Sequence, residues 1–184
     1  MKYLISFLFL ALAFSMKSEA KVTLPSILGD NMVLQQQAEV KLWGKARPNA
    51  TVTVKTSWNG QTYKFSSDGK GGWSLTVSTP VAGGPYKIIF NDGELLTLQN
   101  VLIGEVWFCS GQSNMEMPMG CFDRQPVRGA NDIIAKAKPS TPIRMYTTDS
   151  KDGRWVRQFS KTPAEDCQGE WLENTPVNVS HISA

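Results

Sequence analysis

The sequence has few of the residues that build metal sites and disulfide scaffolds. It contains one histidine and three cysteines among 184 residues. It has neither a cysteine–histidine cluster nor the acidic loop pattern of a calcium-binding EF-hand. Three cysteines are also too few for a disulfide scaffold. We therefore expect no metal site.

Charge is sparse and scattered along the chain. Charged residues make up 19% of the sequence, the net charge is +3, and no basic run occurs. The composition therefore does not indicate nucleic-acid binding. Hydrophobic residues make up 41%, which excludes a disordered or collagen-like chain. Six tryptophans and fifteen glycines are typical of a fold rich in strands and turns.

Residues 1–20 have the pattern of a secretory signal peptide. Lys2 supplies a short positive region, an almost wholly apolar run extends from Leu4 to Phe14, and Ser18 and Ala20 are the small residues that a signal peptidase reads. A transmembrane anchor needs about 20 apolar residues, more than this run contains. We predict cleavage after Ala20, no stable membrane anchor afterwards, and a secreted or periplasmic location.

Residues 21–103 consist of short runs that alternate polar and apolar side chains, with turn sequences between them. Asn59-Gly60 predicts a two-residue hairpin turn, and Asp92-Gly93 marks another turn. No helical period occurs here. We predict an N-terminal antiparallel β-sandwich domain over 21–103. Packing in its core, or a platform on which a carbohydrate stacks, would explain three tryptophans at strand positions: Trp43, Trp58 and Trp73.

The pattern changes near residue 101. The run 101–109 is almost continuously apolar, as in a strand of a parallel sheet that is covered on both faces. Farther on, the sequence predicts a short helix over 133–138 and a strand over 142–146. Strand, turn, helix and strand begin an α/β domain, and 104–184 is short for a complete one. We expect an incomplete α/β domain there, in a chain that is the N-terminal fragment of a longer protein.

Ser113 is the strongest candidate for a catalytic residue. It follows the apolar run in a tight, glycine-containing turn, 110–115. A serine there places its hydroxyl at the end of a strand, and backbone N–H groups of the turn can stabilise an oxyanion, each worth about 3–4 kcal/mol. The Gly-x-Ser-x-Gly pattern of a nucleophile elbow is absent. By position alone, a turn-forming or helix-capping serine is the simpler interpretation.

Three stretches of the chain resemble the sialate O-acetylesterase family. They are Leu24-Pro-Ser-Ile-Leu-Gly-Asp-Asn-Met-Val-Leu-Gln-Gln36, Gly104-Glu-Val-Trp-Phe-Cys-Ser-Gly-Gln-Ser-Asn-Met-Glu116 and Asp166-Cys-Gln-Gly-Glu-Trp171. The family belongs to the SGNH hydrolases, so the resemblance implies a flavodoxin-like α/β hydrolase domain, cut short here, after the β-sandwich. It also implies that Ser113 is the nucleophile, that its backbone N–H is an oxyanion donor, and that no cofactor takes part.

Gln112 and Asn114 flank this serine. They either contact the acyl group or only fix the loop through bonds to its backbone. Glu116 and Asp123, in the next loop, are interpreted as solvated acids rather than as the lining of a sugar-binding cleft.

The resemblance further implies a general base, a histidine in an Asp-x-x-His element, which this sequence lacks. His181 follows Asn178, whose amide replaces the acid and cannot stabilise an imidazolium. We interpret His181 as an ordinary surface or helix-starting histidine. A serine without an adjacent base is a weak nucleophile, so we expect the chain by itself to be inactive.

The cysteines have different predicted surroundings. Cys109 lies in the apolar run and is expected to pack as a small hydrophobic residue. Cys121 and Cys167 lie in polar, loop-like stretches, where two free thiols or a disulfide between them fit equally with the pattern. Such a disulfide would contribute about 4 kcal/mol by constraining the unfolded chain.

The resemblance implies an esterase that removes O-acetyl groups from sialic acids, with an O-acetylated sialic acid or a related acetylated glycan as its substrate. One alternative is an acetylesterase that acts on another glycan such as acetylated xylan. The other is a non-catalytic protein that binds carbohydrate through the β-sandwich and its aromatic side chains.

Overall fold

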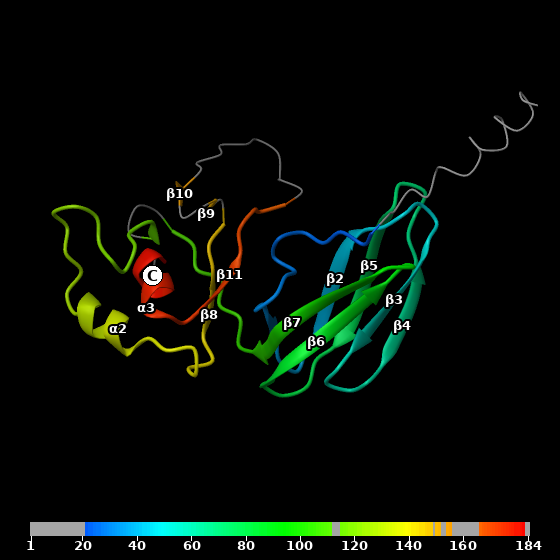
Figure 1. Ribbon diagram of the computed structural model, residues 1–184, viewed down its shortest axis with the longest axis horizontal. Coiled ribbons are helices and arrows are strands. Elements are labelled where there is room, and N and C mark those ends of the chain that lie inside the picture. Colours follow the sequence, from blue (N-terminus) through cyan, green and yellow to red (C-terminus); the bar gives the residue numbers. More distant parts are fainter. Residues whose placement is uncertain (1–20, 112–114, 149, 152–153, 156–165, 183–184) are drawn as a thin grey trace, which may run out of the picture.

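The computed structural model of the chain describes residues 21–111, 115–148, 150–151, 154–155 and 166–182 (Figure 1). The predicted signal peptide therefore lies outside the described residues. The strands and helices are β1 (Val33–Gln35), β2 (Glu39–Lys45), β3 (Thr51–Thr56), β4 (Thr62–Ser66), β5 (Gly72–Ser78), β6 (Gly83–Asn91), β7 (Leu95–Gly104), α2 (Ala130–Lys136), β8 (Arg144–Tyr146), β9 (Ser150–Lys151), β10 (Arg154–Trp155), β11 (Trp171–Glu173) and α3 (Pro176–His181). Within the described part of the chain, no helix is long and apolar enough to cross a membrane.

The first seven strands form two sheets, which Figure 1 shows as one group. The larger sheet has the order β1-β7-β6-β3-β4, and the smaller one pairs β2 with β5. This confirms that the first part of the chain is rich in β-structure. The prediction of a purely antiparallel arrangement is wrong, because β1 pairs with β7 in parallel. Only a tight hairpin forces two strands to be antiparallel, and the whole of β2–β6 separates these two along the chain.

The hydrophobic core lies between the two sheets. Strand β3 alternates exposed and buried side chains, as expected for a strand with one face on the core. The Trp73 ring, on β5, lies 5.7 Å from the ring of Phe90 on β6 and 5.1 Å from that of Phe65 on β4. The two sheets therefore pack face to face. Fully buried core side chains include Leu42, Val52, Val54, Val77, Ile88 and Phe90.

The three strand tryptophans differ in burial. Trp73 is buried, and Trp58 packs against the core with its indole N–H donating to the backbone oxygen of Ser78 at 3.1 Å. Trp43 is 38% exposed. The core interpretation is confirmed for Trp73 and Trp58, so the three rings do not form a shared exposed platform.

The predicted hairpin at Asn59-Gly60 is present, but its turn is longer than two residues. The N–H of Thr56 bonds to the carbonyl of Gln61 at 3.1 Å, so 57–60 form the loop. Gly60 has a φ of 68°, a conformation that glycine adopts at little cost. The longer loop lets Trp58 turn inward, where its ring meets that of Tyr86 edge-on at 5.8 Å.

The prediction of a buried strand over 101–109 is correct for 101–104, where Val101 and Ile103 are buried, and wrong for the rest. Strand β7 ends at Gly104, and residues 105–111 form neither strand nor helix. Trp107 is 83% exposed and Phe108 92% exposed, and Cys109 is exposed rather than packed. A strand is covered on both faces only when layers lie on both sides of its sheet. Among the described residues, no strand pairs with 105–111.

The remaining elements lie beside the β-strands (Figure 1). The predicted helix is confirmed as α2, but it begins earlier, because Gly129 with a φ of 79° is its N-cap. The predicted strand is confirmed as β8, which pairs antiparallel with β11 rather than in a parallel sheet. The described residues of this part contain no parallel strand pair, so the flavodoxin-like domain stays a prediction.

Candidate active site

The three central residues of the candidate site, Gln112, Ser113 and Asn114, lie outside the described residues. Their flanks, Gly111 and Met115, are described. A Cβ atom added to Gly111 would lie only 2.5 Å from Cγ of Met115. The absence of a side chain at Gly111 makes this close approach feasible.

The segment that leads to this turn is fixed where it leaves the sheet. In the β1–β7 register, Gln35 lies opposite Gly104, and the N–H of Gln36 donates to the Gly104 carbonyl at 2.8 Å. The carboxylate of Glu105 accepts two hydrogen bonds, from Nε2 of Gln35 at 3.0 Å and from Nε2 of Gln36 at 2.6 Å. These two amides, that of Gln36 first, hold the pKa of Glu105 below its usual value because they stabilise the charged form.

A second set of contacts joins the first resembling stretch to the third. The Asp166 carboxylate accepts from the N–H of Ser26 at 3.0 Å and from its hydroxyl at 2.7 Å. The Tyr146 hydroxyl donates to Oγ of Ser26 at 3.0 Å and lies 3.4 Å from Sγ of Cys167. Burial, and then the bond to Cys167, raise the pKa of Tyr146, so this phenol stays neutral and available as a donor. The Trp171 indole donates to the carbonyl of Ile27 at 2.8 Å.

An ion pair lies next to these contacts. Arg144, whose side chain is 5% exposed, is 3.1 Å from the carboxylate of Glu173. The amide of Asn100 donates to Glu173 at 3.0 Å and to Asn31 at 2.7 Å. A charge as buried as that of Arg144 requires such a partner.

We call all these contacts the joint: the bonds that residues 24–36 and Asn100 make to 104–106, 144–146 and 166–173, together with the contacts of Tyr146 with Cys167 and of Arg144 with Glu173. The first resembling stretch contacts each of the other two here, through Gln35 and Gln36 to Glu105 and through Ser26 to Asp166, although Ser26 and Asp166 are 140 positions apart in the sequence. Sequence reasoning singled out none of the joint's polar side chains as functional. The available signal was that Gln35, Glu105 and Asp166 lie inside the resembling stretches.

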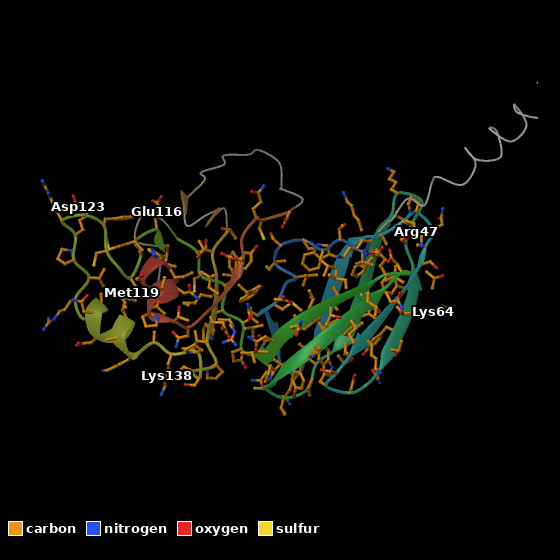
Figure 2. The ribbon with its side chains drawn as sticks, in the orientation of Figure 1. Arg47, Lys64, Glu116, Met119, Asp123 and Lys138 are labelled. Atoms are coloured by element: carbon orange, nitrogen blue, oxygen red, sulfur yellow. The ribbon has the colours of Figure 1, made fainter. Side chains whose placement is uncertain are left out.

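The remaining candidate residues lie away from the joint. His181 is exposed at the end of α3, and its imidazole has no hydrogen bond among the described residues, as expected of a surface histidine. The backbone on either side of it accepts bonds from the loop after Ser113: Met119 donates to the Ile182 carbonyl at 2.9 Å and Gly120 to that of Ser180 at 2.8 Å. Figure 2 shows Met119 beside α3 and Asp123, a solvated acid as predicted, at the outer edge of this loop.

The cysteines form no disulfide. All three thiols are free, so the pairing of Cys121 with Cys167 is not observed. Sγ of Cys121 accepts from the N–H of Val127 at 3.1 Å, whereas Cys167 lies against Tyr146. In the part of the chain that the structure covers, no group of three or more side chains is arranged to hold a metal ion.

The described fold matches part of a carbohydrate acetylesterase. A crystal structure of a carbohydrate acetylesterase from Xanthomonas citri matches it with a TM-score of 0.76 and 29% sequence identity, and the match covers 89% of this chain and 35% of that one. No protein-family model matches the sequence.

Curated sequences show which acetylesterases this chain is similar to. The chain is 34% identical to the sialate O-acetylesterase of Pongo abelii over 169 residues, which are 85% of this chain and 30% of the relative. It is also 34% identical to the sialate O-acetylesterase of Homo sapiens over 105 residues, 50% of this chain and 20% of the relative. The chain is therefore homologous to sialate O-acetylesterases, and it spans about a third or less of the length of these relatives.

Proposed function

We propose that this chain is the part of a serine esterase that carries the nucleophile, Ser113, and that the whole enzyme removes O-acetyl groups from sialic acids. The observation that carries the proposal is the joint, where the first resembling stretch contacts the other two and from which the segment leading to Ser113 departs. Homology to sialate O-acetylesterases supports the substrate class. The predicted signal peptide supports a secreted or periplasmic location.

The proposed reaction is acyl transfer in two steps. The Ser113 oxygen attacks the acetyl carbonyl while a histidine takes its proton, and the backbone N–H of Ser113 donates to the oxyanion that forms. The sugar oxygen then leaves with a proton from that histidine. Water hydrolyses the acetyl-enzyme, which releases acetate and restores the serine. The base is a histidine other than His181, whose preceding Asn178 bonds to the backbone of Glu173 rather than to the imidazole.

Gln112 and Asn114 have supporting roles in this proposal. Their amides hold the turn or contact the acetyl group, while the chemistry rests on the serine. The bonds that hold Glu105 and Val106 to Gln35 and Gln36 support a defined departure of the segment that leads to Ser113.

The test uses the full-length protein and the variants Ser113→Ala and Ser74→Ala. We expect Ser113→Ala to lower the turnover of an aryl acetate by about 10³-fold or more, as loss of a serine nucleophile does in related hydrolases. Ser74 is an exposed serine of β5, and its replacement serves as the matched control, with turnover close to that of the unchanged protein. Equal turnover by all three proteins would exclude Ser113 as the nucleophile.

Two further measurements separate the alternatives. Hydrolysis of O-acetylated sialic acid, compared with that of acetylated xylan, decides which glycan is the substrate. Labelling of Ser113 by a serine-reactive phosphonate distinguishes an esterase from a carbohydrate-binding protein, because a binding protein has no activated serine.

A further inference from the structure

The segment that carries Ser113 has few contacts of its own after it leaves β7. Residues 105–111 form no helix or strand and are exposed. The last described anchor before the turn is at Glu105 and Val106, where the chain is bonded to two successive glutamines at the end of β1. The direction of the segment is therefore decided at this point.

Each of the two glutamine amides both donates and accepts a hydrogen bond. Gln35 donates through Nε2 to Glu105 and accepts through Oε1 from the N–H of Val106 at 2.9 Å. Gln36 donates through Nε2 to Glu105 and accepts through Oε1 from the N–H of Ala82 at 2.9 Å. Neither amide can rotate by half a turn to present its oxygen to residue 105 without losing a bond to the backbone.

The Glu105 carboxylate is the acceptor that completes this arrangement. It faces two N–H donors and accepts one bond on each oxygen, a pattern that a carboxylate satisfies and an amide does not. Bonds to an ionised acceptor are also stronger than those to a neutral one. The main chain is thus held at the carbonyl of Gly104, the side chain of Glu105 and the N–H of Val106.

We propose that Glu105 is a positioning residue, which sets the direction in which the Ser113 segment leaves the β-sheet and thereby places the nucleophile for acyl transfer. Glu105 itself does not touch the reacting atoms. The effect on catalysis rests on the proposed function, whereas the effect on the segment does not. The first resembling stretch then acts as the scaffold of the site, through Gln35 and Gln36.

The test exchanges the carboxylate and one amide between the two partners. Glu105→Gln places an NH₂ group opposite an NH₂ group, and Gln36→Glu places two carboxylates together. In the double variant, the carboxylate introduced at position 36 accepts from the N–H of Ala82 and from the NH₂ group introduced at position 105. The amide oxygen at position 105 accepts from Gln35, so every hydrogen bond is restored. Glu94→Gln is the matched control, because Glu94 is an exposed residue just before β7, at the opposite end of that strand from Glu105.

Two readouts are measured. In this chain, amide hydrogen exchange at Val106 or Ala82 should rise about tenfold in each single variant, as expected for a lost hydrogen bond of about 1.4 kcal/mol, and should return to the original rate in the double variant. In the full-length protein, kcat on an aryl acetate should fall about tenfold in Glu105→Gln with little change in KM, and recover in the double variant. The control should change neither.

Each outcome decides one of the two claims. Unchanged exchange in Glu105→Gln overturns the proposal, since the carboxylate then does not hold the segment. Faster exchange with unchanged kcat overturns the positioning role, because the direction of the segment would not matter to Ser113. A full-length protein with no Ser113-dependent turnover contradicts the proposed function instead, and the exchange result alone then decides whether Glu105 sets the course of the segment.

Discussion

The β region, residues 21–104, and the region after it differ in how they bury their apolar side chains. The connected core consists of fourteen buried residues from Val22 to Ile103. In the described part of the second region, the buried hydrophobic residues are Ala130 and Val179. Large apolar side chains there are exposed instead, Trp107 and Phe108 most of all. The β region thus supplies its own core, whereas the described part of the second region has no comparable core and is tied to the β region through the joint.

The two regions differ because apolar packing holds the β region together, whereas polar contacts join the second region to it. Facing sheets exclude water from apolar side chains over a continuous area, which contributes in proportion to that area. The joint is mostly polar, and each of its hydrogen bonds contributes only about 1 kcal/mol net of the water it displaces. It therefore orients the second region without giving that region a core.

The largest expected effect comes from substituting one phenylalanine in each region. Phe90→Ala removes a fully buried ring and should lower the free energy of unfolding by about 3–5 kcal/mol, since it leaves a cavity. Phe108→Ala removes a ring that is 92% exposed and should change it by about 0.5 kcal/mol or less. Urea unfolding of the two variants measures both values. A loss of similar size at Phe108 would contradict the contrast between the regions.

A smaller effect is expected at the joint. Glu173→Gln removes the charge that pairs with Arg144. Breaking a fully buried pair costs about 3–5 kcal/mol, but Glu173 is 37% exposed, so we expect about 1–3 kcal/mol. Faster amide exchange in β8 and β11, with unchanged exchange in β3 and β6, would show that the second region loosens alone. Glu170→Gln, at an exposed position just before β11, is the control and should leave both regions unchanged.

The smallest effect concerns acid stability of the β region. The backbone N–H groups of Lys70 and Gly72 lower the pKa of Asp68 by bonding to its carboxylate in the β4–β5 turn, at 2.7 Å and 2.8 Å. A lowered pKa in the folded state means that the carboxylate stabilises the fold above the unfolded pKa of about 3.9, and that this contribution is lost as the pH falls through the folded value.

Asp68→Asn tests this dependence. Its stability should match that of the unchanged chain at low pH and fall slightly below it near neutral pH, because asparagine keeps an acceptor oxygen but not the charge. Thermal unfolding between pH 2 and pH 7 measures the difference between the two proteins. A difference that grows toward acid pH would have the wrong sign and would contradict the assignment.

Much of the β region was predictable because its signals are local. Alternation along β3 and the turn at Asn91-Asp92-Gly93 act over a few neighbouring residues, and Gly93 adopts a φ of 119° that favours glycine. The length of the β3–β4 loop was not predictable, because the inward packing of Trp58 against Tyr86 decided it. The same holds for the parallel pairing of β1, which joins strands far apart in the sequence.

The candidate site divides in the same way. Ser113 was predicted as the nucleophile from the resembling stretch around it, and it stays a prediction because it lies outside the described residues. Glu105 lies in the same stretch but was not predicted to have a role, because its neighbours in the sequence do not distinguish it from an exposed acid. Its meaning comes from Gln35 and Gln36, about seventy positions earlier in the chain. The prediction that Cys109 is packed was wrong for a related reason. An apolar run indicates that a segment favours burial, but it does not show whether another part of the protein covers it.

The sequence by itself determined the strand-forming segments and most of the turns, and it led to the prediction that Ser113 is a nucleophile. Periodicity, glycine at left-handed turns and a specific motif are properties of neighbouring residues, so they can be read without knowledge of the tertiary structure. The tertiary structure alone decided that β1 lies parallel to β7, that residues 24–36 contact both Glu105 and Asp166, and that Glu105 completes the anchor of the Ser113 segment. These depend on hydrogen bonds and packing between residues distant in the sequence, which exist only once the core has brought the strands together.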